Sequence, residues 1–136
     1  AYLRTGEGAQ RATFTTGFCM GGTLSFYSGM QDFGFAGLIG FYSGFTRAFA
    51  GANGPLLEEA VHIKYPVLGL YGGDDQAITR EQIETFDKAL DKAGVEHEIV
   101  IYPCAPHSFF DRRATEYAEA SADAWKRVLG FIAAHS

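Results

Sequence analysis

Four short runs with strand character divide this chain, and polar or glycine-rich residues bound each of them. The first, Thr13–Thr16, is rich in β-branched residues, while Phe35–Tyr42, Pro66–Tyr71 and Glu98–Tyr102 are mostly continuous apolar stretches. A short apolar run without alternation is typical of a parallel strand that is covered on both faces. The pattern therefore predicts about four parallel strands.

Helical patterns separate these strands. Thr79–Gln82 has the form of a capping box, and Gly94 supplies a helix stop. Between them, apolar residues recur at helical spacing, namely Ile83, Phe86, Leu90 and Ala93. A short helix is predicted over residues 55–61, with Pro55 in its first turn.

The C-terminal stretch from Ala114 to Ala134 also has a helical pattern. One face collects its apolar residues, which are Tyr117, Ala124, Val128 and Phe131 or Ile132. Strands that alternate with helices predict an α/β protein with a parallel sheet and flanking helices.

The segment around Cys19 carries the strongest functional signal. Gly17-Phe18-Cys19-Met20-Gly21 ends the first predicted strand and opens a helix, which is the G-x-S-x-G nucleophile elbow with cysteine in place of serine. A turn this tight is expected to tolerate little side chain at Gly17 and Gly21. The helix N-terminus favours a thiolate at Cys19 over a thiol. The alternative interpretation is a buried structural cysteine.

Polar residues follow two of the later strands. Asp74 and Asp75 come after the third strand and His107 after the fourth, so both loops fall on the sheet edge that carries Cys19. Nucleophile, acid and histidine follow one another in the chain order of α/β-hydrolases. An isolated aspartate is more often a turn former, and an isolated histidine more often a surface residue. Their arrival in this order predicts a Cys19–Asp75–His107 catalytic triad.

Three segments together resemble the signature regions of the dienelactone hydrolase family. They are Gly17–Gly22, Gly72–Ile78 and Ala105–Phe109. The resemblance implies an α/β-hydrolase with a cysteine nucleophile that opens the lactone ring of carboxymethylenebutenolides and related esters. It favours Asp75 over Asp74 as the acid, because Gly72-x-x-Asp75-x-x-Ile78 matches the family spacing.

The resemblance covers nearly the whole chain but only the C-terminal half of the family fold. We therefore expect a single domain over residues 1–136 that is N-terminally incomplete. The absent half would supply further strands, a second oxyanion-hole contact and a substrate-binding arginine. The family also places an arginine four residues after the histidine, where this chain has Asp111 followed by Arg112.

Composition narrows the choice of partners. The formal net charge is −5, and no basic patch with interleaved aromatic residues is visible, so nucleic acid is not an expected partner. No apolar run approaches the roughly 20 residues of a membrane span, and no signal peptide is recognisable. With two cysteines, a disulfide framework is not expected, and a catalytic Cys19 must stay reduced, which favours the cytoplasm. Cys104-x-x-His107 lacks a second ligand pair, so neither metal nor cofactor is predicted.

Three functions are compatible with these residues. The preferred one is a carboxylic-ester or lactone hydrolase in which Cys19 forms an acyl-thioester, His107 moves protons and the Met20 N–H stabilises the oxyanion. The others are a non-catalytic hydrolase-like module for association or ligand binding, and a different enzyme of the same fold. Substrate-binding candidates are Tyr42, Phe45, Arg47 and Arg112.

The first strand raises a further expectation. In the family it is an interior strand, whereas here it would form an exposed edge, which is a template for pairing with another chain. We expect a homodimer or an N-terminal segment to complete the sheet.

Overall fold

The computed structural model describes residues 12–46, 51–110 and 115–136. Its centre is a parallel sheet in the order β1-β2-β3-β4. The strands are β1 (Phe14–Phe18), β2 (Gly37–Phe41), β3 (Val67–Gly72) and β4 (His97–Tyr102). The predicted α/β class with four parallel strands is confirmed.

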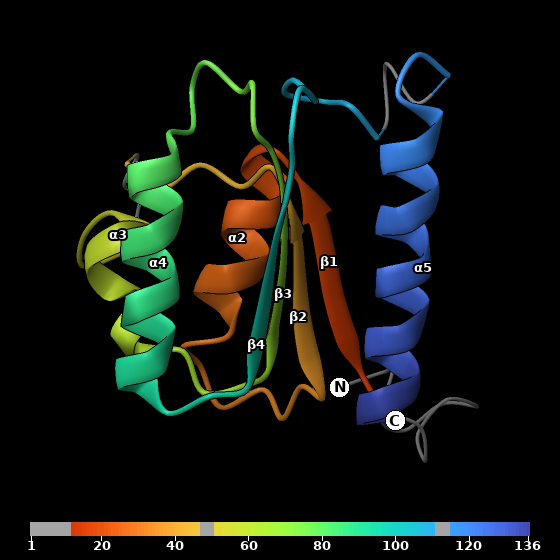
Figure 1. Cartoon of the computed structure of the whole chain (residues 1–136). Coiled ribbons are helices and arrows are strands. Elements are labelled where there is room, and N and C mark those ends of the chain that lie inside the picture. The colour runs from red at the N-terminus through yellow and green to blue at the C-terminus, as the bar shows by residue number, and fades with distance from the viewer. Residues whose placement is uncertain (1–11, 47–50, 111–114) are drawn as a thin grey trace.

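Helices cover the sheet on both faces (Figure 1). On one face lie α2 (Met20–Ser28), α3 (Leu56–Glu59) with the 3₁₀ turn η1 (Ala60–His62), and α4 (Arg80–Ala93). The opposite face carries α5 (Ala118–His135). The sheet is thus the middle of three layers, as expected for parallel strands joined by helical crossovers.

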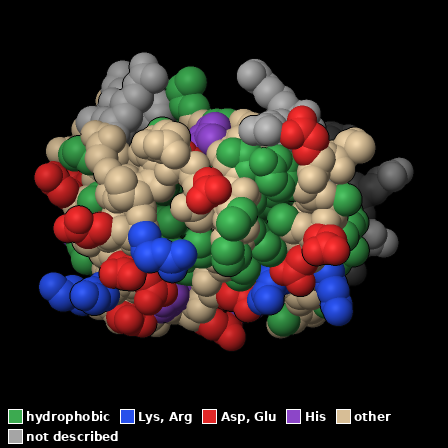
Figure 2. Space-filling view, turned by 45° about the horizontal axis from the view of Figure 1, so that its top comes forward, with side chains coloured by type: hydrophobic (Ala, Val, Ile, Leu, Met, Phe, Trp, Pro, Cys, Tyr) green, Lys and Arg blue, Asp and Glu red, His purple; other side chains and the backbone are tan. Residues whose placement is uncertain are grey.

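Burial explains why the apolar runs were continuous. Every residue of β2 and β3 is buried, since these two central strands pack against helices on both faces. The strands β1 and β4 are only partly buried, because each ends the sheet within the described residues. Figure 2 shows hydrophobic side chains gathered in one area of the face in view. Along β4, Ile99, Val100 and Ile101 are half-buried.

The helix α4 follows the sequence prediction closely. The Thr79 side chain accepts a hydrogen bond from the Gln82 N–H, and the Gln82 side chain accepts one from the Thr79 N–H, each at 3.2 Å. Gly94 ends the helix in the left-handed conformation at φ 72°. The buried face includes Ile83, Phe86 and Leu90, which packs the helix against the sheet.

Two helix boundaries differ from expectation. Pro55 immediately precedes α3 with an extended ψ of 151°, so it does not belong to the first turn. The helix α5 begins at Ala118, after a turn at residues 115–117, rather than at Ala114. Its predicted apolar face is present, because Ala124, Val128 and Phe131 are buried against the sheet. In the described part of the chain, no helix combines the length and apolarity needed to cross a membrane.

Candidate active site

Cys19 sits in a strained turn that connects β1 directly to α2. Its backbone angles, φ 54° and ψ −120°, lie outside the regions that residues other than glycine usually adopt. The Cys19 N–H donates to the Phe41 carbonyl at 3.0 Å, and its own carbonyl accepts from the Thr23 N–H at 3.2 Å. Cys19 therefore makes the last hydrogen bond between β1 and β2 and accepts the first hydrogen bond of α2. Together these two bonds hold its thiol at the carboxyl edge of the sheet.

The glycines around Cys19 have different roles. A Cβ at Gly17 would lie 2.2 Å from the carbonyl carbon of Gly21, and one at Gly22 would lie 2.1 Å from the Ser43 hydroxyl oxygen. Gly17 therefore needs to be glycine for the close approach of helix and strand, whereas at Gly22 the hydroxyl could turn away and the nearest backbone atom, the Gly17 carbonyl oxygen, lies 3.0 Å from such a Cβ. A Cβ at Gly21 would meet nothing within 4 Å. The expectation that Gly21 tolerates little side chain is wrong, because its backbone rather than its missing side chain makes the contact.

His107 lies between Cys19 and Asp75. Its Nε2 is 3.1 Å from the Cys19 Sγ, and its Nδ1 is 2.6 Å from the Asp75 Oδ2. The imidazole side chain keeps 38% of its surface exposed, whereas the Asp75 side chain keeps 1%. The three residues predicted from separate strand ends thus form one connected chain of polar contacts.

The loop after β3 fixes the Asp75 carboxylate. Its Oδ1 accepts hydrogen bonds from the Ala77 N–H at 2.8 Å and the Ile78 N–H at 3.2 Å. These donors leave Oδ2 to face His107, where an ionised carboxylate acts only as an acceptor. The Nδ1 atom therefore carries the proton, and Nε2 is free to accept the thiol proton. The neighbouring Asp74 is exposed.

A cavity of about 270 Å³ opens beside the thiol. Tyr42 and Phe45 line it together with Cys19 and His107. Tyr42 has a φ of 40°, and the centre of its ring lies 5.0 Å from that of His107. Both aromatic residues are fully buried, so they pack in the core as well as line the cavity.

Several lining residues were missed by sequence reasoning. They are Thr23, Gly44, Thr46, Ala77 and Ile78, with Met20 also present. Ala77 and Ile78 belong to the Gly72–Ile78 motif that holds Asp75, so their place in that motif could have indicated that they line the cavity. Nothing in the pattern indicated that Thr23 would join the loop after β2, where its hydroxyl donates to the Gly44 carbonyl at 2.9 Å.

The remaining polar candidates divide into two groups. Arg47, Asp111 and Arg112 lie outside the described residues. In the Cys104-x-x-His107 segment, Cys104 is exposed, while both ring nitrogens of His107 already face Cys19 and Asp75.

The Tyr71 ring packs against Phe45, which lines the cavity, with ring centres 5.5 Å apart. Its complete burial raises the pKa of the Tyr71 phenol well above the ordinary value. The ring therefore packs as a neutral group.

Comparison with solved structures supports the same fold. A crystal structure of a "Putative Dienelactone Hydrolase" from Klebsiella pneumoniae has a TM-score of 0.79 at 33% identity, over 88% of this chain and 51% of that one. The acylaminoacyl peptidase of Pyrococcus horikoshii has a TM-score of 0.77 at 19% identity, over 98% and 26% of the two chains, and so shares the fold alone.

Sequence comparison gives the family. A "Putative carboxymethylenebutenolidase" of Salmonella typhimurium is 37% identical over 133 residues, which are 96% of this chain and 48% of that protein. One of Saccharolobus solfataricus is 36% identical over 97% of this chain and 48% of its own length. This chain thus spans about half the length of the curated relatives that it matches. The family model for the dienelactone hydrolase family matches residues 1–136, and the chain belongs to that family.

Proposed function

We propose that the protein is a thiol-dependent hydrolase of carboxylic esters or lactones, with Cys19, His107 and Asp75 as its catalytic residues. The observation that carries the proposal is the continuous contact from Sγ through the imidazole to a buried carboxylate, at 3.1 and 2.6 Å. Family membership supports hydrolase chemistry. The relatives' printed name, carboxymethylenebutenolidase, suggests an unsaturated lactone as substrate.

The first half of the reaction forms a thioester. His107 Nε2 takes the thiol proton, and Sγ attacks the substrate carbonyl carbon to give a tetrahedral oxyanion. When that intermediate collapses, the bond to the leaving oxygen breaks and His107 returns the proton to it. Asp75 holds the imidazole in the tautomer that these transfers need and stabilises its protonated form.

The second half of the reaction hydrolyses the thioester. His107 deprotonates a water molecule, which attacks the acyl carbon, and the thiolate leaves and regains its proton. Met20 begins α2, so its N–H is among those that a helix leaves without an intrahelical acceptor. We assign it to the oxyanion, and Tyr42 and Phe45 to substrate binding.

Cysteine labelling offers a direct test, because the chain contains a matched control. Cys104 is exposed and Cys19 is only partly so, so accessibility alone favours faster alkylation of Cys104. Under this proposal iodoacetamide labels Cys19 faster near neutral pH, and His107→Ala slows that labelling. Slower labelling at Cys19 than at Cys104 would argue for a non-catalytic module.

Hydrolysis rates of two variants provide a second test of the proposed function. In the full-length protein, Cys19→Ser is expected to keep the fold and to lose most activity toward a p-nitrophenyl ester and a butenolide. His107→Ala is expected to cost at least as much, because acylation and thioester hydrolysis both need proton transfer. If His107→Ala kept the parent kcat/KM, the triad would be wrong. A catalytic thiolate must stay reduced. We therefore propose that the protein acts in the cytoplasm.

We also propose that a further strand pairs with β1 in the assembled protein, supplied by an N-terminal segment or a second copy. The Thr13 carbonyl accepts from Ala36, and the Cys19 N–H donates to Phe41, so the odd-numbered residues of this strand face β2. The backbone groups of even-numbered residues, such as Thr16, therefore point away from β2. Slow hydrogen exchange of the Thr16 amide in the full-length protein would support pairing, and fast exchange would contradict it.

A further inference from the structure

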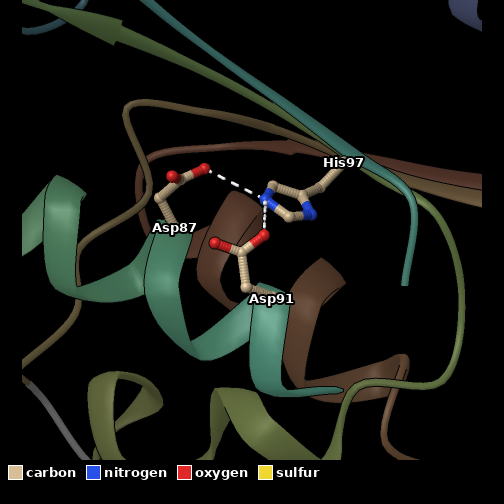
Figure 3. Close-up of side chains that lie close together, drawn as sticks. All are labelled: Asp87, Asp91 and His97. Atoms are coloured by element: carbon tan, nitrogen blue, oxygen red, sulfur yellow. Dashed lines mark ion pairs between the residues drawn. The ribbon is translucent and has the colours of Figure 1, made fainter. Parts of the chain in front are cut away.

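A second group of polar side chains lies between α4 and β4, apart from the cavity beside Cys19. Asp87 and Asp91 are four residues apart on α4 and so share one face of the helix. His97 begins β4 and points toward both carboxylates (Figure 3). Its Nε2 lies 3.0 Å from the Asp87 Oδ1 and 3.4 Å from the Asp91 Oδ1.

The contact of the other ring nitrogen, Nδ1, determines which nitrogen of a neutral His97 carries the proton. The Nδ1 atom lies 2.9 Å from the Val95 carbonyl oxygen, which can only accept, so Nδ1 donates. A neutral His97 then presents the lone pair of Nε2 to two carboxylate oxygens, and these three acceptors repel one another. A cation bound among the three atoms removes this repulsion. Metal-binding histidines are oriented in this way, with the second nitrogen donating to a backbone carbonyl.

The spacing of the three ligand atoms suits a transition metal. All of them lie within 4.8 Å of one another. Zinc bonds of about 2.0–2.2 Å in tetrahedral geometry put the ligand atoms about 3.3–3.6 Å apart. The distances from Nε2 to the two carboxylate oxygens, 3.0 and 3.4 Å, are close to that range. Two carboxylates and a neutral imidazole carry a charge of −2, which a divalent ion cancels.

Access to the site is one-sided. The His97 side chain keeps only 12% of its surface exposed, whereas Asp87 keeps 47% and Asp91 keeps 68%. The imidazole is therefore held by the fold, while the carboxylates remain open to water. An ion can enter from solvent and keep a water molecule as its fourth ligand.

We propose that Asp87, Asp91 and His97 bind a divalent transition metal, with Zn²⁺ as the best fit. Imidazole nitrogen with carboxylate oxygen favours zinc over the all-oxygen sites of calcium and magnesium. The bound ion joins α4 to β4, a strand that ends the sheet within the described residues. His97 is the first residue of β4, so the ion holds that end of the strand against α4.

The test uses Zn²⁺ alone and the full-length protein with Cys19→Ala, so that the catalytic thiol does not bind the ion. Isothermal titration is expected to give one Zn²⁺ per chain, and thermal unfolding a higher Tm with the ion than without it. His97→Gln and Asp91→Asn are each expected to weaken binding at least about tenfold, because even outer partners of a ligand are worth 10–100-fold.

His135→Gln is the matched control. His135 also pairs with a carboxylate, Glu96 at 2.8 Å, but no second acid shares that contact in the described structure, so its loss is expected to leave Zn²⁺ affinity unchanged. Absence of saturable binding at millimolar Zn²⁺ would overturn the proposal. Unchanged affinity in Asp91→Asn would overturn it equally. Because the Asp91 side chain is exposed, Asp91→Asn is expected to fold, and it decides the question even if His97→Gln does not fold.

Discussion

Asp75→Asn tests how the structure prepares the imidazole. The Ala77 and Ile78 N–H groups both donate to Oδ1, so an amide at this position must turn its oxygen toward them. The amide NH₂ is then forced toward the Nδ1 of His107, 2.6 Å from the present Oδ2. The Nδ1 atom has to accept, the ring proton moves to Nε2, and Nε2 can no longer take the thiol proton.

The size of the effect follows from this tautomer exchange. The same replacement in a serine triad costs about 10⁴-fold in kcat. A thiol is more acidic than a hydroxyl and needs less help from the base, so we expect kcat/KM to fall about 10²–10⁴-fold, or about 2.7–5.4 kcal/mol in activation free energy. The fold should survive, since the amide oxygen retains both backbone hydrogen bonds.

The assay is steady-state hydrolysis of a p-nitrophenyl ester by the full-length protein, beside the rate of iodoacetamide labelling at Cys19. Asp74→Asn is the matched control, because that neighbouring residue is exposed and is expected to keep its kcat/KM within about twofold. If Asp75→Asn kept its kcat/KM within about threefold, the assignment of Asp75 as the residue that fixes the imidazole would be refuted.

Two further predictions concern stability. Gly17→Ala is expected to lower the free energy of unfolding by about 1–3 kcal/mol, because its Cβ would lie 2.2 Å from Gly21, whereas Gly21→Ala, with open space, should cost far less in urea denaturation. The pKa of His135 lies above its ordinary value. The larger cause is its hydrogen bond with the Phe131 carbonyl, and the smaller is its hydrogen bond with the Glu96 carboxylate. That stabilisation is fully present below the ordinary histidine pKa, about 6.5, and is lost as pH rises through the higher folded value. The free energy of unfolding of His135→Gln should therefore lack this decline, and an identical decline in the variant would refute the assignment.

Much of the fold was readable from local pattern. The apolar runs around Leu38 and Leu68 marked central strands because a strand covered on both faces needs no polar alternation. The capping box at Thr79 and the stop at Gly94 bounded α4, since both act through neighbouring backbone groups. The start of α5 was not readable in this way, because no capping side chain bonds at Tyr117 to mark it.

The pattern of residues along the chain was enough to predict the strands, the helices and their order, and that a cysteine, an aspartate and a histidine meet at the carboxyl edge of the sheet. Chain order and strand ends sufficed for this, because parallel strands bring their carboxyl ends to one side. The choice of Asp75 over Asp74 rested on the motif spacing of the family that the chain resembles. The orientation of the Asp75 carboxylate, the open space beside Gly21 and the meeting of Asp87 and Asp91 with His97 became visible only in the folded chain. The Asp75 donors are only two and three residues away, but the folded shape of the loop is needed to bring both to Oδ1. The His97 contacts depend on how α4 packs against β4, and residue spacing along the chain does not contain that distance.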